Sequence, residues 1–532
     1  MNPRRLFSLI LICLSLSIPV QHSATAASTF DVCQYGAVGD GVSKDTKAIR
    51  AAIDDAARQG GGTILFPPGR YLTGTLDLYD HITLHLQAGA TILGSKDLAD
   101  YPKRIPAFRS YTDNYVQYAL IYAEKATNIS IEGRGTIDGQ GGEFVTREYL
   151  IRPYVIRMVE CSNVTVEDVT LRNSPMWMQH YLACDGVKIH GIRVENLCNY
   201  NNDGLDLDSC RNVVVSDCVI YSDDDAICLK STSPRMCENI TISNCVIGSH
   251  CNALKMGTET NGGFNNIAIS NCTISPPPKS DWSKNTIGIS GIALEIVDGG
   301  AMDQIVIDNI TMRGVKSPLF IRLGNRARPH KANAKTPDIG KMKNISISRV
   351  IANDVSNYGC VISGLPNHRI ENISLSDIQF HFPKSDAKPK PLGAVPELED
   401  RYPEATMFGP TPSYGLFARH VDGIRMNGLR FSFDEQETRP ALALDDAHNV
   451  QLFDCMFEPS RFGSLIHLRN SREVFVHGCT TMPNTNAFIS CEGDVEEFNL
   501  IGNNFQNAKQ VVDSVNQKTD IDLSGNRLPP ND

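Results

Sequence analysis

The densest group of carboxylates in the chain lies in two short segments, residues 202–208 and 222–227. Asp203 stands in the first segment, and Asp224 and Asp225 stand in the second. Carboxylates held close together repel one another, so one of them is expected to keep a proton near neutral pH. An ionised carboxylate beside a protonated one is the pair that acid/base hydrolysis requires. We therefore predict that these three aspartates are catalytic.

Two structural interpretations of the same aspartates stay open at this point. Aspartates in turns commonly accept hydrogen bonds from backbone amides, and clustered carboxylates are also ligands that calcium prefers. Residue type alone does not separate these interpretations from catalysis. The elements that carry the aspartates must therefore be predicted first.

A short phrase recurs along the chain: a polar residue, a β-branched or aromatic residue, any residue and an aliphatic residue. Away from a few long steps, it returns every 23 to 28 residues. Alternation with period two predicts strands, and a fixed period in the twenties predicts a solenoid whose units bury their apolar faces on one another. Leucine-rich repeats share the period, but the sequence lacks their recurrent leucines and helical return. The phrase begins at Asn128, Asn163, Gly186, Asn212, Asn239, Asn266, Gln304, Asn344, Asn372, Gly423, Asn449, Glu473, Glu497 and Asp520.

We predict an all-β fold, a single-stranded right-handed parallel β-helix that forms one domain over residues 27–532. Asp203 and Asp224 are 21 residues apart, which is close to one coil. The two aspartates should therefore lie one rung apart on the same side, within roughly 5 Å of each other.

The cysteines fall into register with this repeat. Four lie two residues before the first position of the phrase, and five lie six residues after it. Residues at one repeat position stack in neighbouring coils, so we predict two ladders of small buried side chains rather than disulfides or metal ligands. Cys33, Cys228, Cys251, Cys360 and Cys491 are freer candidates for pairing. The ladders are Cys161, Cys184, Cys210 and Cys237, and Cys218, Cys245, Cys272, Cys455 and Cys479.

Residues 45–58 predict an amphipathic helix that ends at the three glycines 60–62. Such a helix would cover the open N-terminal end of the solenoid, where strand edges would otherwise be exposed. Long steps in the repeat predict loops that wall a groove, at 275–285, 325–343 and 383–421. The apolar face of the helix comprises Ala48, Ile49, Ala52, Ile53 and Ala56.

The first residues predict export. Two arginines precede an apolar stretch at 6–20, and small residues follow at 23–27. This order is typical of a secretory signal peptide, and the apolar stretch is short for a membrane span, so we expect a cleaved signal at 1–26 rather than an uncleaved anchor. The mature chain should be secreted or periplasmic. The net charge of −10 offers no general attraction for nucleic acid or an anionic membrane, and we expect a monomer without a cofactor or metal.

From about Phe30 to Phe433 the chain resembles the polygalacturonase-type glycoside hydrolases of family 28, which are pectin-degrading parallel β-helix enzymes. Several phrases that carry the resemblance occur in the family's order. They read Gly-Arg-Gly-Thr-Ile-Asp-Gly at 133–139, Asn-Ser-Pro-Met-Trp at 173–177, Asn-Asn-Asp-Gly at 201–204 and Asp-Asp-Asp at 223–225.

The resemblance implies inverting hydrolysis of a pectic polysaccharide. It makes Asp225 the general acid that protonates the leaving oxygen, and it makes Asp203 and Asp224 the residues that hold and activate water. His250, from the family's Gly-His-Gly phrase, would lie beside them, although its flanking glycines are replaced. Inversion requires carboxyl groups roughly 6.5–9.5 Å apart, more than backbone stacking alone provides.

The family's Arg-Ile-Lys phrase, which grips the galacturonate carboxylate, should fall near Ile292. The chain instead reads Gly-Ile-Ala-Leu-Glu-Ile at 291–296, and Glu295 would repel a uronate. We therefore expect branched rhamnogalacturonan to be a better substrate than plain polygalacturonate. The predicted substrate-binding residues are Asn202, Lys230, Lys255, Glu295 and Arg322. Further candidates are Arg326 and Arg328 as cations, and Trp177, Tyr402, Phe408 and Tyr414 as stacking rings.

Two other functions fit the same scaffold. A polysaccharide lyase or epimerase would use calcium on the aspartates and a basic residue that abstracts a proton. A non-catalytic carbohydrate-binding solenoid would leave the aspartates without a role. The product of the reaction, with and without a chelator, distinguishes these functions from hydrolysis.

Overall fold

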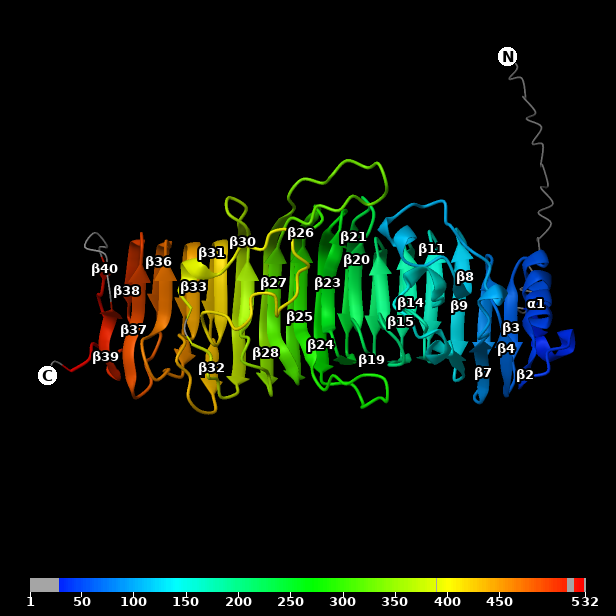
Figure 1. The fold of residues 1–532 in the computed structure, drawn as a ribbon, viewed down its shortest axis with the longest axis horizontal. Helices are drawn as coiled ribbons and strands as arrows, with labels where there is room; N and C mark the ends of the chain where they lie inside the picture. The colour runs from blue at the N-terminus through cyan, green and yellow to red at the C-terminus, as the bar shows by residue number, and fades with distance from the viewer. Residues whose placement is uncertain (1–27, 389, 514–520, 531–532) are drawn as a thin grey trace, which may run out of the picture.

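The computed structural model describes residues 28–388, 390–513 and 521–530. Strands of successive coils pair in parallel from one end of the molecule to the other, so the chain forms a right-handed parallel β-helix (Figure 1). The predicted fold is confirmed. The predicted signal at 1–26 lies outside the described residues. Within the described ranges, no helix has the length and apolar character needed to cross a membrane.

Most coils contribute strands to three faces of the solenoid, and the coils from β35 onward contribute strands to the first two faces. The first face consists of β5 (Leu76–Asp77), β8 (Ala119–Glu124), β11 (Tyr154–Val159), β14 (Gln179–Leu182), β17 (Leu205–Asp208), β20 (Ile227–Ser231), β23 (Asn252–Thr260), β25 (Gly288–Ile296), β27 (Val315–Leu323), β29 (Cys360–Ser363), β31 (Leu416–Asn427), β33 (Leu442–Phe453), β35 (Ser464–Arg469), β37 (Thr485–Glu492) and β39 (Ala508–Asp513).

The second face also takes the later parts of β31 and β33. Its other strands are β1 (Thr29–Asp31), β3 (Gly62–Phe66), β6 (Ile82–Leu86), β9 (Thr127–Gly133), β12 (Ser162–Glu167), β15 (Asp185–His190), β18 (Arg211–Ser216), β21 (Cys237–Ser243), β24 (Phe264–Ile274), β26 (Ala301–Arg313), β28 (Lys341–Asn353), β30 (Ile370–Phe382), β36 (Arg472–His477), β38 (Glu496–Ile501) and β40 (Ile521–Asp522).

The third face takes the ends of the long strands β24, β26, β28 and β30. Its other strands are β2 (Asp40–Lys44), β4 (Gly69–Thr73), β7 (Ala90–Gly94), β10 (Thr136–Asp138), β13 (Thr170–Arg172), β16 (Arg193–Asn196), β19 (Val219–Ser222), β22 (Val246–Ser249), β32 (Arg430–Phe433) and β34 (Met456–Phe457).

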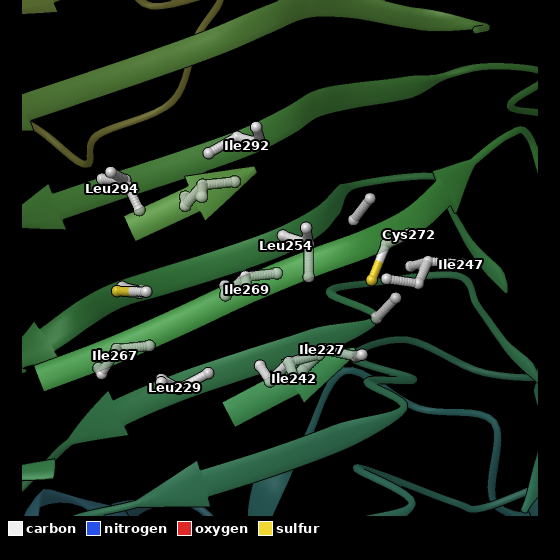
Figure 2. Packing of buried hydrophobic residues seen from close by; sticks show 14 of the residues in the cluster. Ile227, Leu229, Ile242, Ile247, Leu254, Ile267, Ile269, Cys272, Ile292 and Leu294 are labelled. Carbon is white, nitrogen blue, oxygen red and sulfur yellow. The ribbon is translucent and has the colours of Figure 1, made fainter. Parts of the chain in front are cut away.

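Alternate side chains of every strand point into a continuous apolar core. Ile227, Leu229 and Leu254 of the first face meet Ile242 and Ile267 of the second face, and all five are almost fully buried (Figure 2). Each such side chain stabilises the fold by about 1.5–3 kcal/mol relative to an exposed one. The intervening residues of the first face, such as those beside Leu205 and Leu207, point outward.

The polar residue that starts each phrase has a conformational reason. Asn212, Asn239 and Asn266 all have φ between 54° and 57°, in the left-handed region that asparagine tolerates better than most residues. Their amides also form a ladder, because Asn239 Nδ2 donates to Asn212 Oδ1 (3.1 Å) and Asn266 Nδ2 to Asn239 Oδ1 (2.9 Å). The repeat therefore marks the corner between two faces.

The cysteine ladders are confirmed as packing. Cys184 and Cys210 are fully buried, and their thiols lie against backbone carbonyls of the coils, as in the contact from Cys210 Sγ to Tyr181 O (3.1 Å). All fifteen cysteines of the described residues are free thiols. The suggestion of pairing is therefore wrong in this structure for all five candidates, which are Cys33, Cys228, Cys251, Cys360 and Cys491.

The predicted cap is helix α1 (Thr46–Arg58), which lies at the N-terminal end of the solenoid (Figure 1). Ile49, Ala52, Ile53 and Ala56 are fully buried against β1, β3 and neighbouring segments. Gly61 follows the helix at φ 120°, where an added Cβ would lie 2.4 Å from the Cβ of His81. The short 3-10 helices among the described residues are η1 (Val32–Tyr35), η2 (Leu98–Asp100), η3 (Tyr111–Asn114), η4 (Gly141–Phe144), η5 (Tyr149–Ile151) and η6 (Leu392–Ala394).

Candidate active site

A cavity of about 360 Å³ opens over the first face, above the coils of β14, β17, β20 and β23. The three aspartates predicted to be catalytic all contribute to its wall, together with four cationic side chains and five aromatic ones. The lining residues are Tyr111, Tyr115, Tyr149, Met176, Trp177, Asn201, Asp203, Asp224, Asp225, Lys230, Lys255, Thr258, Glu259, Arg326, Arg328 and Tyr402.

The stacking of the aspartates differs from the prediction. Leu205 pairs with Ile227, and Gly204 N donates to Asp225 O (2.9 Å), so the offset between these coils is 22 residues. Asp203 therefore stacks on Asp225, not on Asp224. A coil of 22 residues rather than 21 shifts the second aspartate of the Asp224–Asp225 pair onto the rung of Asp203.

Asp225 is held as a carboxylate. Its Oδ2 lies 2.9 Å from Lys255 Nζ, and its Oδ1 accepts from Asn252 Nδ2 (2.8 Å). Burial opposes ionisation of Asp225, but the ammonium groups of Lys255 and Lys230 outweigh it and lower the pKa of this carboxyl. Asp225 is therefore stabilised in its ionised form, which is the form that a general base needs.

Asp224 has a different environment. Burial and the neighbouring charge of Asp225 raise the pKa of Asp224 to about 6, against the opposing effect of Lys255 and Lys230. Its Oδ2 accepts a weak hydrogen bond from Asn201 Nδ2 (3.3 Å), and its Oδ1 accepts from the backbone of Asp225 (3.0 Å). Asp224 can therefore hold a proton in mildly acidic solution and release it.

Beneath these residues lies a buried charge cluster. Lys230 Nζ lies 3.8 Å from Asp203 Oδ2, 3.5 Å from Asp206 Oδ1 and 3.7 Å from Glu259 Oε2. Burial, with the nearby charges of Asp206 and Asp224, raises the pKa of Asp203 well above its ordinary value, and burial raises the pKa of Asp206 to about 8. Asp203 Oδ1 is buried and accepts no hydrogen bond from the described residues.

The cations of the cavity are not equivalent. Arg328 is bound by carboxylates, with contacts to Glu259 Oε1 (3.1 Å) and Asp298 Oδ2 (2.5 Å). Arg326 donates to Thr258 Oγ1 (3.2 Å) and lies 5.1 Å from the ring centroid of Tyr402, and within the described parts of the chain no carboxylate forms an ion pair with it. Arg326 therefore offers the free guanidinium of the site.

Three predicted substrate contacts, Asn202, Glu295 and Arg322, lie outside the cavity wall. Asn202 is fully buried, where its side chain joins the backbone of Cys198, Asn199, Ser174 and Met176, and the neighbouring Asn201 lines the cavity instead. Arg322 is fully buried and donates to the carbonyls of Glu397 and Leu398 (2.7 and 3.3 Å).

His250 also lies beside the cavity rather than in its wall. Its Nδ1 is 2.9 Å from Asp223 Oδ1, and Asp223 also accepts from Trp282 Nε1 (3.3 Å). Of the predicted stacking rings, Trp177 and Tyr402 line the cavity, whereas Phe408 and Tyr414 are buried away from it.

Glu295 does not present a negative charge to the cavity. Its side chain is fully buried beside Gly257, and its Oε2 accepts no hydrogen bond from the described residues. Burial raises the pKa of Glu295 to about 8, because the nearby Lys255 only partly offsets the loss of solvent. The raised pKa favours the neutral form of Glu295, which argues against the expected repulsion of a uronate.

Several residues of the site escaped prediction. Glu259 lies on β23 at an even spacing from Lys255, so the alternation that singled out Lys255 also pointed to it. Asn252 lies three residues before Lys255 on the same strand and donates a hydrogen bond to Asp225. Tyr111, Tyr115 and Tyr149 come from the connections 95–118 and 139–153, and no repeat signal in the sequence could place them.

One group near the cavity has the spacing of a metal site. Ligand atoms of Asp224, Asp225 and Cys251 lie within 4.8 Å of one another. Lys255 already supplies a positive charge at 2.9 Å from Asp225, so a cation would have to displace or outcompete that ammonium group. We therefore assign no metal to these residues.

The chain is similar in sequence to a known protein family. The family model described as glycosyl hydrolases family 28 matches residues 72–391, more than half of the chain. The chain belongs to this family. The matched range contains the three aspartates, Lys230, Lys255 and Arg326, whereas Tyr402 lies beyond it.

Two curated relatives of this family 28 chain share part of its sequence. A probable polygalacturonase of Vitis vinifera is 33% identical over 228 residues, which are 40% of this chain and 46% of the relative. An exo-poly-alpha-D-galacturonosidase of Dickeya chrysanthemi is 27% identical over 249 residues, 37% of this chain and 41% of the relative. The chain thus spans less than half the length of either relative.

A solved structure supports the fold over a longer range. A hyperthermoactive exopolygalacturonase from Thermotoga maritima superposes with a TM-score of 0.57 at 21% identity, covering 75% of this chain and 92% of that one. At this identity the likeness shows the parallel β-helix alone.

Proposed function

We propose that this protein is a glycoside hydrolase that cleaves a pectic polysaccharide by acid/base hydrolysis. The observation that carries the proposal is the placement of three aspartates in one cavity with opposite protonation tendencies. Asp225 is ionised beside Lys255, while the pKa of Asp224 is raised to about 6. Two carboxyl groups whose environments move their pKa values apart are suited to the roles of base and acid.

We assign the general acid to Asp224 rather than to Asp225, which the family resemblance had suggested. Asp225 carries a full charge held by Lys255 and Asn252, so it is suited to take a proton from water. Asp203 stacks on Asp225 and both line the cavity, so we assign to this pair the water that attacks the sugar. Asp224 then faces the leaving oxygen from its own side. Inversion at the anomeric carbon remains a prediction of this arrangement.

The proposed substrate carries carboxylates. Arg326 offers a guanidinium that no carboxylate of the described chain binds, and a guanidinium matches the geometry of a uronate carboxylate. Tyr402, half exposed at the mouth of the cavity, and Trp177 offer aromatic faces to a sugar ring. The burial of Glu295 and its raised pKa weaken the objection to polygalacturonate, so both polygalacturonate and rhamnogalacturonan belong in the test.

We also propose that the protein acts outside the cytoplasm as a monomer, on plant cell-wall pectin. The order of charged, apolar and small residues at 1–27 supports a cleaved export signal. Fractionation of the native host, with the mature N-terminus determined by sequencing, tests the location. Light scattering of the purified protein tests the oligomeric state.

The decisive experiment incubates the protein with polygalacturonate, rhamnogalacturonan and xylogalacturonan, with and without a chelator. New reducing ends without ultraviolet-absorbing unsaturated ends support hydrolysis. Unsaturated products that disappear with the chelator would identify a lyase instead. A change of sugar configuration without cleavage would identify an epimerase, and binding without any product would identify a carbohydrate-binding solenoid.

A further inference from the structure

The outward side chains of the first face change character abruptly beside the site. One register row is mostly polar up to Lys255 and apolar immediately after it. Because these residues point outward yet are almost completely buried, something other than the solenoid core must cover them. In chain order the row reads Tyr122, Arg157, His180, Asp206, Cys228, Lys255, Ala293, Phe320, Val361, Phe417 and Ala443.

The cover on the C-terminal side is the connection 383–415, between β30 and β31. Leu392, Val395, Ala405 and Phe408 of this connection form one apolar cluster with the row from Ala293 onward. The first face therefore offers no open surface for a polymer in the coils directly beyond Lys255.

This cover is firmly attached. Arg419, fully buried in β31, donates to Val395 O (2.9 Å) and Pro396 O (2.8 Å), and Arg322 of β27 donates to the carbonyls of Glu397 and Leu398. Tyr402 follows in the same connection, and its hydroxyl lies 3.3 Å from Lys255 Nζ. Tyr402 of this connection thus forms the C-terminal wall of the cavity.

A second cover closes the N-terminal side. Tyr115 of the connection 95–118 packs on Trp177 and on Tyr149 of the connection 139–153, with ring centroids 5.5 and 5.4 Å apart. Val116 joins Trp177 in a buried cluster over the coils that precede Asp203. The outward surface on this side is therefore filled with rings and aliphatic side chains.

The same connection also reaches past the aspartates. Tyr111 N donates to Thr232 O (2.9 Å), one residue after β20, and Arg328 of the connection 324–340 lies 4.3 Å from the Tyr111 ring centroid. Tyr115 Oη donates to Glu259 Oε1 (2.9 Å), which Arg328 also binds. Segments from both sides of the site therefore meet along one flank of the cavity.

We propose that this cavity accepts the end of a glycan chain and not an interior segment, so that cleavage proceeds from chain ends. An interior segment needs a groove open on both sides of the scissile bond, and here the surface is covered on both sides along the solenoid. The cavity volume of about 360 Å³ lies at the low end of the range of small-ligand pockets. The inference rests on the proposed hydrolase function and specifies its mode of action.

The test uses oligogalacturonides and rhamnogalacturonan oligosaccharides that carry a fluorophore at the reducing end. Cleavage from chain ends is expected to yield either labelled chains that shorten stepwise or one short labelled product from the start of the reaction. On the polymer, reducing ends should accumulate with little loss of viscosity. Labelled fragments of all lengths at early times, with a rapid loss of viscosity, would overturn the proposal.

A binding measurement separates failure of this inference from failure of the proposed function. Calorimetry with the Asp224→Asn variant compares oligosaccharides with free ends against the same oligosaccharides capped at one end and at both ends. Chain-end binding predicts at least a tenfold loss of affinity when the accepted end is capped. Equal affinity for capped and free chains would overturn the chain-end proposal while keeping the substrate class. No binding of any oligosaccharide would overturn the substrate class, and the chain-end proposal with it.

Discussion

The ammonium group of Lys255 lies 2.9 Å from an oxygen of Asp225, and the two side chains are only 2% and 4% exposed to solvent. A buried ion pair of this kind fixes the protonation state of each partner, because removal of one charge leaves the other uncompensated. Lys255 thus determines which aspartate of the cavity is ionised. The backbone pairing of Cys228 with Lys255 places it on the rung that follows the aspartates.

Lys255→Met should abolish most of the activity. Without the ammonium group the pKa of Asp225 rises, so a base that must be ionised becomes protonated at mildly acidic pH. We expect kcat/KM to fall at least about 100-fold, and the acidic limb of its pH profile to move to higher pH. Lys279→Met, at an exposed position, is the matched control. An unshifted pH profile in Lys255→Met would contradict this role.

The acid and base can be distinguished by leaving-group rescue. Asp224→Asn and Asp225→Asn should each lower the rate on natural substrate by about 10²- to 10⁴-fold. An aryl glycoside with an acidic phenol needs no general acid, so it should restore much of the rate to Asp224→Asn and little to Asp225→Asn. The reverse pattern would return the acid role to Asp225. Unchanged circular dichroism and melting temperature serve as the folding control.

Glu295 should make stability depend on pH. Its pKa in the folded protein is about 8, against an ordinary value near 4.3 in an unfolded chain. The folded state therefore binds this proton more tightly, and the resulting stability is complete below about pH 4 and is lost as pH rises toward 8. Glu295→Gln should remove this loss.

The measurement is the free energy of unfolding between about pH 5 and pH 8. The difference between Glu295→Gln and the parent should change by up to about 1.4 kcal/mol per pH unit in favour of the variant. Glu371→Gln, at an exposed position, should follow the parent curve. Parallel curves for Glu295→Gln and the parent would show that the residue is already ionised.

Arg322→Ala should loosen the connection 383–415. The variant loses charge-assisted hydrogen bonds to Glu397 O and Leu398 O, each worth about 1.5–3 kcal/mol. Limited proteolysis should then cut within 383–415 before the rest of the solenoid, and activity should fall because Tyr402 loses its support. A substrate contact without a structural role would instead raise KM and leave the protease pattern unchanged. Arg349→Ala, at an exposed position, is the control.

The repeat predicted the fold because each coil of a solenoid repeats the same residue pattern in the sequence. Asn212 and Asn239 recur where the backbone must turn left-handed, and the cysteine ladders follow the same period. The prediction that Asp203 stacks on Asp224 was wrong by one residue. The length of that coil depends on its turns, and the turns do not repeat from coil to coil.

The cavity could be predicted only in part. Lys230 and Lys255 lie on strands whose alternation aims them outward, whereas Asp203, Asp224 and Asp225 lie in the turns just before β17 and β20. The structure brings all five to the cavity. The walls come instead from long connections, whose path depends on tertiary contacts rather than on a period. For the same reason Arg322 was predicted to contact the substrate, although its guanidinium donates hydrogen bonds to backbone carbonyls of such a connection.

The aspartates and the covers of the cavity are encoded in separate parts of the chain. The coils supply the reacting groups, while 95–118, 139–153 and 383–415 are inserted between strands whose register they leave unchanged. Selection can therefore lengthen or trim an insertion without retuning the acid or the base. On such a scaffold, a change between cleavage from chain ends and cleavage within chains is a change of loop length rather than of chemistry.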